Sequence, residues 1–74
     1  MRFDHRQVLR RRKLLALSQE ELAQRAGVTQ EIISLVERGK NQSAKTFKKL
    51  ARALGLKLED LLIEDEELAG AHHK

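Results

Sequence analysis

The sequence LSQEELAQRAGVTQEIISLVERG, residues 17–39, contains two helix starts on either side of a glycine turn. Ser18 and Glu21 have the spacing of a capping box, in which each side chain accepts a hydrogen bond from the other residue's backbone N–H. Gly27 can adopt a positive φ without steric cost, and Thr29 then caps the next helix. The pattern therefore predicts two short helices joined by a tight turn, which is typical of a DNA-reading helix-turn-helix.

The apolar residues around these caps predict which side of each helix faces the core. Leu17 and Leu22 have the spacing of a hydrophobic staple, and Ala23 is small enough for the second helix to approach closely. Ile33 and Val36 lie three residues apart and share the inner face of the second helix. The outward-facing side chains of that helix are then Gln30, Glu31, Ser34 and Leu35.

The order of a small residue, a turn glycine and two core positions resembles the phage repressor and Cro family of helix-turn-helix regulators, the xenobiotic-response-element type. The resemblance runs from about Val8 to Leu62, and its motifs are the run around Arg12, SQEELA at 18–23, GVT at 27–29, ERGK at 37–40 and LARALGL at 50–56. It implies an all-α, lambda repressor-like bundle of five helices, the third of which lies in the major groove. The chain departs from the family at Leu35, where a polar residue is common, and after Lys40, where a proline is common.

Composition agrees with an all-α fold. A chain of 74 residues is one domain near the lower size limit for a self-sufficient core, so oligomerisation is a plausible supplement. The absence of proline and the abundance of Leu, Ala, Glu, Lys and Arg favour helices, and β-branched residues never alternate over a strand length. The chain has no cysteine, which excludes disulfides and thiolate chemistry. It also has no long apolar run, so we expect a cytoplasmic, nucleoid-associated protein with no membrane contact.

The first helix is predicted to start at Asp4 and to place Val8, Arg12 and Leu15 on one inward face. An inward arginine needs a carboxylate partner, because a buried unpaired charge costs about 3 to 5 kcal/mol. Glu37 is the best candidate, since it ends the helix that Thr29 caps, the one expected to lie in the major groove. The family pattern also pairs an arginine with a glutamate at these two positions. Two interpretations stay open: a purely structural pair, or a pair that also presents Arg12 to a DNA phosphate.

Two more helices are predicted after the polar loop at residues 40–43. The first runs from Ala44 to Leu54, capped by Ser43 and stopped by Gly55. The second, around Glu59–Ile63, carries more apolar surface than one short helix can hide. Part of that surface is expected to form a dimer interface; the alternative is that it closes the monomer core. The interface residues are Leu58, Leu62 and Ile63. We expect residues 1–63 to form the domain and residues 64–74 an acidic, flexible tail.

Charge is divided unequally along the chain. Through Lys57 there are fourteen Lys or Arg against five Asp or Glu, and from Leu58 onward one against six. A basic body suits a polyanion, because each neutralised phosphate releases condensed counterions. The alternative is a helical surface that is simply rich in lysine and arginine.

DNA contacts are predicted in two groups. In the major groove, glutamine can bond adenine in two places, glutamate can accept from cytosine, and threonine or leucine can touch a thymine methyl. The base-reading group is Thr29, Gln30, Glu31, Ser34 and Leu35. The second group lies where the family grips the sugar-phosphate backbone, which sets register only. Its members are Arg12, Gln19, Arg38, Lys40, Asn41, Gln42 and Lys45. The alternative for the loop at residues 40–45 is mere solvation.

The sequence contains no catalytic triad, glycine-rich phosphate loop or metal-spaced cluster, and His72 and His73 lack further ligands. We therefore expect no enzyme activity, no cofactor and no metal. The first hypothesis is a sequence-specific transcriptional regulator of bacterial or phage type, acting as a repressor and binding double-stranded DNA at an inverted-repeat operator as a homodimer. The second is an antitoxin or protein-interaction module, which would dock a toxin or antirepressor on exposed Ile32 and Leu35.

Overall fold

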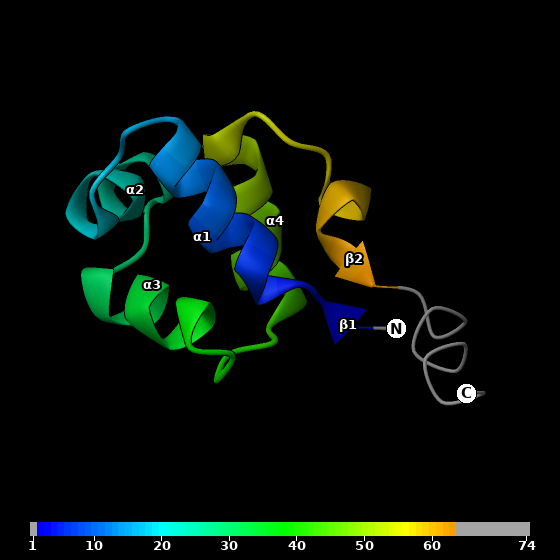
Figure 1. Ribbon diagram of the computed structural model, residues 1–74. Coiled ribbons are helices and arrows are strands. Elements are labelled where there is room, and N and C mark those ends of the chain that lie inside the picture. Colours follow the sequence, from blue (N-terminus) through cyan, green and yellow to red (C-terminus); the bar gives the residue numbers. More distant parts are fainter. Residues whose placement is uncertain (1, 64–74) are drawn as a thin grey trace.

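The computed structural model of the chain describes residues 2–63 (Figure 1). The elements, in chain order, are β1 (Arg2–Phe3), α1 (His5–Leu14), α2 (Gln19–Ala26), α3 (Gln30–Glu37), α4 (Ala44–Leu54), the 3₁₀ helix η1 (Leu58–Leu61) and β2 (Leu62–Ile63). Figure 1 shows α2 and α3 together at one end of the molecule and the β1–β2 pair at the other. The predicted acidic tail at residues 64–74 lies outside the described residues.

The helix-turn-helix begins and ends at the predicted caps. Ser18 Oγ accepts a hydrogen bond from Glu21 N at 3.0 Å, and Glu21 Oε1 accepts one from Ser18 N at 2.8 Å, so the capping box is complete. Gly27 ends α2 in the left-handed conformation at φ 72°. Thr29 Oγ1 accepts from Ile32 N at 3.2 Å and starts α3. Local sequence alone thus accounts for this part of the fold.

The first and fourth helices also begin at their predicted caps. Asp4 Oδ1 accepts from Arg6 N at 3.1 Å at the start of α1. Ser43 Oγ accepts from Thr46 N at 3.3 Å at the start of α4, and Gly55, at φ 72°, ends that helix. These caps fix the lengths of the two helices that support the helix-turn-helix from behind.

One apolar core joins the four α-helices and η1. Phe47 is fully buried, and the ring of half-buried Phe3 stacks on it with ring centroids 4.5 Å apart. Burying a side chain of this kind stabilises the fold by roughly 1.5 to 3 kcal/mol. The core residues are Val8, Leu17, Leu22, Ala23, Ile33, Val36, Phe47, Leu50, Ala51, Leu54 and Leu61.

The structure corrects the predicted fifth helix and adds one short pair of strands to the predicted helical fold. The chain at the expected helix Glu59–Ile63 forms only the four-residue 3₁₀ turn Leu58–Leu61, so residues 2–63 contain four α-helices. Residues 62 and 63 are extended and pair antiparallel with β1, which sets Phe3 opposite Leu62. A two-residue strand is too short to show alternation in sequence, and its pairing depends on a segment at the far end of the chain.

Leu15 does not lie on the inward face where it was predicted. The helix α1 ends at Leu14, and Leu15 is its C-cap with 39% of its surface exposed. Ala16 follows with a φ of 57°, which turns the chain away from the helix axis before α2 begins. The inward face of α1 therefore ends at Arg12.

Candidate DNA-binding site

The helix α3 buries one side and leaves the other accessible. Ile33 and Val36 are fully buried in the core and fix the rotation of the helix about its axis. Figure 1 shows α3 along the outer edge of the molecule, beside α2. The accessible side consists of exposed Thr29, Gln30 and Glu31 and half-buried Ser34 and Leu35. All five predicted base-reading residues thus keep accessible surface along one helix and its N-cap.

Ile32 was expected to be exposed, but it packs partly against the core. Because Leu35 is also half-buried, α3 carries no exposed large apolar side chain. Within residues 2–63, the exposed large apolar side chains are Leu14, at 72%, and Leu15, at 39%, both at the end of α1. Ile32 and Leu35 therefore offer only a partly accessible apolar surface on α3 for the docking that the protein-interaction hypothesis requires.

Arg12 and Glu37 form a two-pronged ion pair that joins α1 to the end of α3. Arg12 Nε donates to Glu37 Oε2 at 2.6 Å and Arg12 Nη2 donates to Glu37 Oε1 at 3.1 Å. The side chains are only 12% and 6% exposed. Hydrogen bonding to the Glu37 carboxylate, which accepts from Arg12, raises the pKa of Arg12 above its usual value, although burial acts in the opposite direction. The arginine therefore stays charged and held in place.

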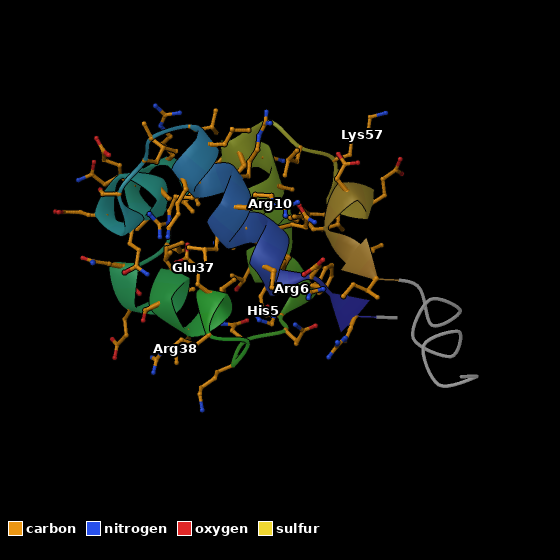
Figure 2. All side chains as sticks on the ribbon, in the orientation of Figure 1. His5, Arg6, Arg10, Glu37, Arg38 and Lys57 are labelled. Carbon is orange, nitrogen blue, oxygen red and sulfur yellow. The ribbon has the colours of Figure 1, made fainter. Side chains whose placement is uncertain are left out.

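Two further hydrogen bonds extend this pair into a network across three helices. Arg12 Nη1 donates to Leu17 O at 2.8 Å, just before α2. Gln19 Nε2, in the first turn of α2, donates to Glu37 Oε1 at 3.0 Å. Figure 2 shows Glu37 in the interior, between the helices that supply these donors. The network braces α3 from behind, and it directs the Gln19 amide nitrogen inward.

The network bears on the two interpretations of Arg12. Each of its three side-chain nitrogens already donates to Glu37 or Leu17, which agrees with a structural role. A guanidinium has five N–H groups, so two remain for a phosphate at the 12% of the side chain that is exposed. The bond from Gln19 to Glu37 was not predicted, because sequence spacing does not show which side chains meet between helices.

The segment after α3 carries most of the cations predicted to contact the DNA backbone. Arg38, Lys40 and Lys45 are exposed, and Figure 2 shows Arg38 at the outer edge of α3. Arg38 Nε also donates to Ser34 O at 3.3 Å, along its own helix. Arg38 is the C-cap of α3, Lys40 follows it in the loop and Lys45 lies in the first turn of α4.

The polar loop residues have partners within the protein. Asn41 Oδ1 accepts from Ser43 N at 2.9 Å. Gln42, predicted to contact DNA, bonds to the backbone of Phe3: its Oε1 accepts from Phe3 N at 2.8 Å and its Nε2 donates to Phe3 O at 3.0 Å. No sequence signal indicates this second arrangement, because it depends on where the N-terminal strand lies.

The apolar residues predicted to form a dimer interface are neither fully buried nor fully exposed. Leu58, Leu62 and Ile63 are half-buried, and Leu58 packs on the core. Only Leu61, between them, is completely buried. Part of the surface thus closes the monomer and part stays accessible beside the β1–β2 pair.

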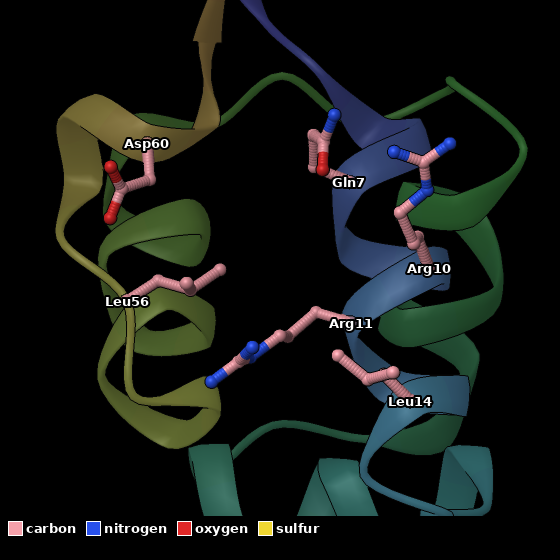
Figure 3. A pocket seen from close by; sticks show the side chains of 6 residues that line it. All are labelled: Gln7, Arg10, Arg11, Leu14, Leu56 and Asp60. Carbon is pink, nitrogen blue, oxygen red and sulfur yellow. The ribbon is translucent and has the colours of Figure 1, made fainter.

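A pocket of about 170 Å³ lies between α1 and the segment that leads into η1 (Figure 3). Arg11 reaches across it and donates from Nε to Leu54 O at 3.3 Å, at the end of α4. The carboxylate of Asp60 accepts from Lys57 N at 2.9 Å. The lining residues are Gln7, Arg10, Arg11, Leu14, Leu56 and Asp60. This set pairs no nucleophile with a base, so the pocket does not resemble a catalytic centre.

Residues 2–63 bring together no group of three or more His, Cys, Asp or Glu side chains that could hold a metal ion. No helix in the same part of the chain is long and apolar enough to cross a membrane.

Sequence comparisons find relatives among archaeal regulators. An HTH-type transcriptional regulator of Archaeoglobus fulgidus is 50% identical over 52 residues, which are 69% of this chain and 73% of the relative. One from Methanothermobacter thermautotrophicus is 47% identical over 58 residues, covering 76% of this chain and 84% of the relative. Most of each relative is therefore matched.

Solved structures share the fold. The complex of SinR protein with SinI protein contains a chain that superposes with a TM-score of 0.74 at 30% identity, covering 86% of this chain and 64% of that one. A hypothetical transcription factor, NHTF from Neisseria, gives a TM-score of 0.65 at 36% identity, with 80% and 70% covered. The helix-turn-helix family model matches residues 8–61. The chain belongs to the helix-turn-helix family of transcriptional regulators, of the phage repressor and Cro type.

Proposed function

We propose that this protein is a sequence-specific DNA-binding repressor that inserts α3 into the major groove of an inverted-repeat operator as a dimer. The observation that carries the proposal is the bracing of α3 by Arg12, Glu37 and Gln19 behind an accessible polar face. Base discrimination needs side chains held in fixed positions, and a part-buried network that ties three helices together supplies that rigidity.

The accessible face of α3 supplies chemistry for base reading. Gln30 can bond both the N6 and N7 positions of adenine, and Glu31 can accept from cytosine N4. Thr29 Oγ1 already accepts the cap hydrogen bond from Ile32 N, so its methyl group, its hydroxyl proton and one oxygen lone pair remain for DNA. Arg38, Lys40 and Lys45 then neutralise phosphates on either side of the groove.

The proposed dimer would match the two-fold symmetry of an inverted-repeat operator. Two helix-turn-helix units bind half-sites about 34 Å apart, one turn of DNA, and the operator mirrors their two-fold axis. The accessible parts of Leu58, Leu62 and Ile63 supply the apolar contact between the copies. A small core gains stability from such an interface.

Selection from a pool of random-sequence duplexes with the full chain tests this function. We expect enrichment of an inverted repeat whose half-sites are one helical turn apart. Affinity for that site, measured by fluorescence anisotropy, should fall steeply with salt concentration. Enrichment of no sequence, together with salt-independent or absent binding, would count against the proposal.

A second candidate function is an interaction module for a toxin or antirepressor. The observation that favours it is the exposed pair Leu14 and Leu15 at the end of α1. A solved neighbour of this fold is named as a complex of two different proteins. The first partner to test is the product of the adjacent reading frame. On this alternative, Leu14→Glu abolishes complex formation, Lys40→Ala does not, and the duplex selection enriches no site.

A further inference from the structure

Gln42 behaves like a residue of a neighbouring strand. Its side-chain amide accepts from Phe3 N at 2.8 Å and donates to Phe3 O at 3.0 Å, across 39 positions of sequence. An amide side chain has one carbonyl and one NH₂ group, and both ends are used on a single backbone residue. The loop after α3 is thereby joined to β1 by two hydrogen bonds.

The opposite edge of β1 is held by the end of the described chain. β1 pairs with β2, and Asp4 N donates to Leu61 O at 2.7 Å. The ring of Phe3 stacks on buried Phe47 in α4. The N-terminal strand therefore has a fixed position, set by β2 on one edge and by the core beneath it.

A second contact joins the same segment to the other end of the loop. Gly39 has a φ of 77°, and a Cβ placed on it would lie 3.0 Å from Cε1 of His5. The loop backbone thus passes directly against the imidazole. Figure 2 shows His5 at the start of α1, close to the segment that follows α3. Residues 2–5 therefore contact the loop at both Gly39 and Gln42.

We infer that Gln42 is a positioning residue for DNA binding: it fixes the loop Gly39–Gln42 on β1, so that Lys40 and Asn41 meet the sugar-phosphate backbone. The inference rests on the proposed DNA-binding function and goes beyond it. Lys40 is exposed, and its contribution depends on where the loop holds its backbone. Because Gln42 is bonded at both ends to Phe3, we assign it a role through β1; one Nε2–H stays free, so the test must separate this role from a direct phosphate contact.

A double-mutant cycle separates these two roles. The affinity of Gln42→Ala, Lys40→Ala and the double variant for a short labelled duplex is measured by anisotropy at one low salt concentration. We expect each single change to weaken binding about three- to tenfold, the size of one or two lost hydrogen bonds. The double variant should bind about as well as Gln42→Ala, because Lys40 is already misplaced. Gln24→Ala, which changes an exposed glutamine of α2, is the matched control and should leave affinity unchanged.

Each outcome has one meaning. Additive losses, or no loss in Gln42→Ala, would overturn the positioning role while leaving DNA binding intact. Amide exchange gives a readout without DNA: Gln42→Ala should speed exchange of the Phe3 N–H while the Leu50 N–H stays protected, and an unchanged Phe3 rate would also overturn the inference. Failure of the unmodified chain to bind any duplex would overturn both the proposed function and this role.

Discussion

Glu37 is held in the helix-turn-helix by several hydrogen bonds and by burial of its side chain. It accepts two hydrogen bonds from Arg12 and one from Gln19 while only 6% of its side chain is exposed. Removing one member of such a pair leaves the other charge shielded from water without a partner, which is costly in free energy. Removing both members leaves no unpaired charge, so only their packing contacts are lost. Single substitutions in this pair therefore test directly how α3 is held in place.

Glu37→Ala should destabilise the domain by up to about 3 kcal/mol, because it leaves the largely buried Arg12 guanidinium without its carboxylate partner. Combining it with Arg12→Met should recover much of that loss, and urea unfolding of the singles and the double gives the coupling energy. The matched control is Arg6→Ala, which breaks an ion pair to Asp4 whose arginine is 75% exposed and should change stability by about 1 kcal/mol or less. A coupling energy near zero would contradict the bracing of α3.

Gln30→Ala should weaken binding to the selected operator by about 1 to 3 kcal/mol and binding to random duplex much less, because a two-point base contact discriminates between sequences. Lys45→Ala is the comparison and should weaken both alike, since a phosphate contact carries no sequence information. Anisotropy titrations with the two duplexes measure the difference. Equal losses for Gln30→Ala on both would remove it from the base-reading set.

Gly39→Ala should destabilise the domain more than Gly27→Ala. Both glycines have positive φ, so either change costs about 1 to 2 kcal/mol in backbone strain. At Gly27 a new Cβ meets nothing within 4 Å, whereas at Gly39 it lies 3.0 Å from the His5 ring. Denaturant unfolding gives both values, and His5→Ala in the Gly39→Ala background should recover part of the excess. Equal losses at the two glycines would show that the His5 contact has no energetic weight.

At the scale of elements, the caps explain why most of the helices could be predicted. The Ser18 box, the Thr29 and Ser43 caps, and the glycines that end α2 and α4 are signals contained within a few residues. Short-range chemistry of this kind is visible in one sequence without knowledge of the fold.

The remaining elements depend on contacts between distant segments. β1 and β2 have two residues each and exist only because the ends of the described chain meet. Gln42 was assigned to DNA from its place in the loop, whereas its bonds to Phe3 depend on where β1 lies. Leu15 was placed inward by helical spacing, which fails where Ala16 turns the chain. The pair of Arg12 with Glu37 could be predicted because an inward charge needs a partner and the family pattern named one.

The α2 cap should give stability a dependence on acid pH. Hydrogen bonds from the Ser18 backbone and hydroxyl lower the pKa of Glu21 from 4.5, with a smaller contribution from Arg25. Since the folded pKa lies below the unfolded one, the stabilisation is present above about pH 4.5 and is lost as pH falls through the folded pKa. Glu21→Gln keeps a side chain of similar shape that does not titrate. The melting temperatures of the two proteins should therefore converge as pH falls through the folded pKa of Glu21; a constant difference from neutral to acid pH would contradict the assignment.

At the scale of the whole molecule, charge governs the encounter with DNA. The segment through Lys57 has nine more basic than acidic residues, and the remainder has five more acidic than basic ones. A plot of the logarithm of affinity against that of salt concentration should be linear, with a slope near −0.9 per phosphate neutralised. Lys45→Ala should reduce the slope by about one, whereas Gln24→Ala should leave it unchanged. An unaltered slope in Lys45→Ala would place that cation outside the interface.

The pairing of β1 with β2 has a consequence for how the domain is made. Phe3 lies opposite Leu62, so this contact closes nearly the whole described chain into a loop, whereas α2 and α3 are neighbours in sequence. Closing a loop about three times longer than the helix-turn-helix costs about 1 kcal/mol more entropy, and a two-residue ladder returns little of it. We expect the helix-turn-helix to form first and the ends to join last. During synthesis on the ribosome, β1 is then made early but cannot pair until β2 has also been made. The loop that carries Lys40 is therefore fixed on β1 only at the end of folding.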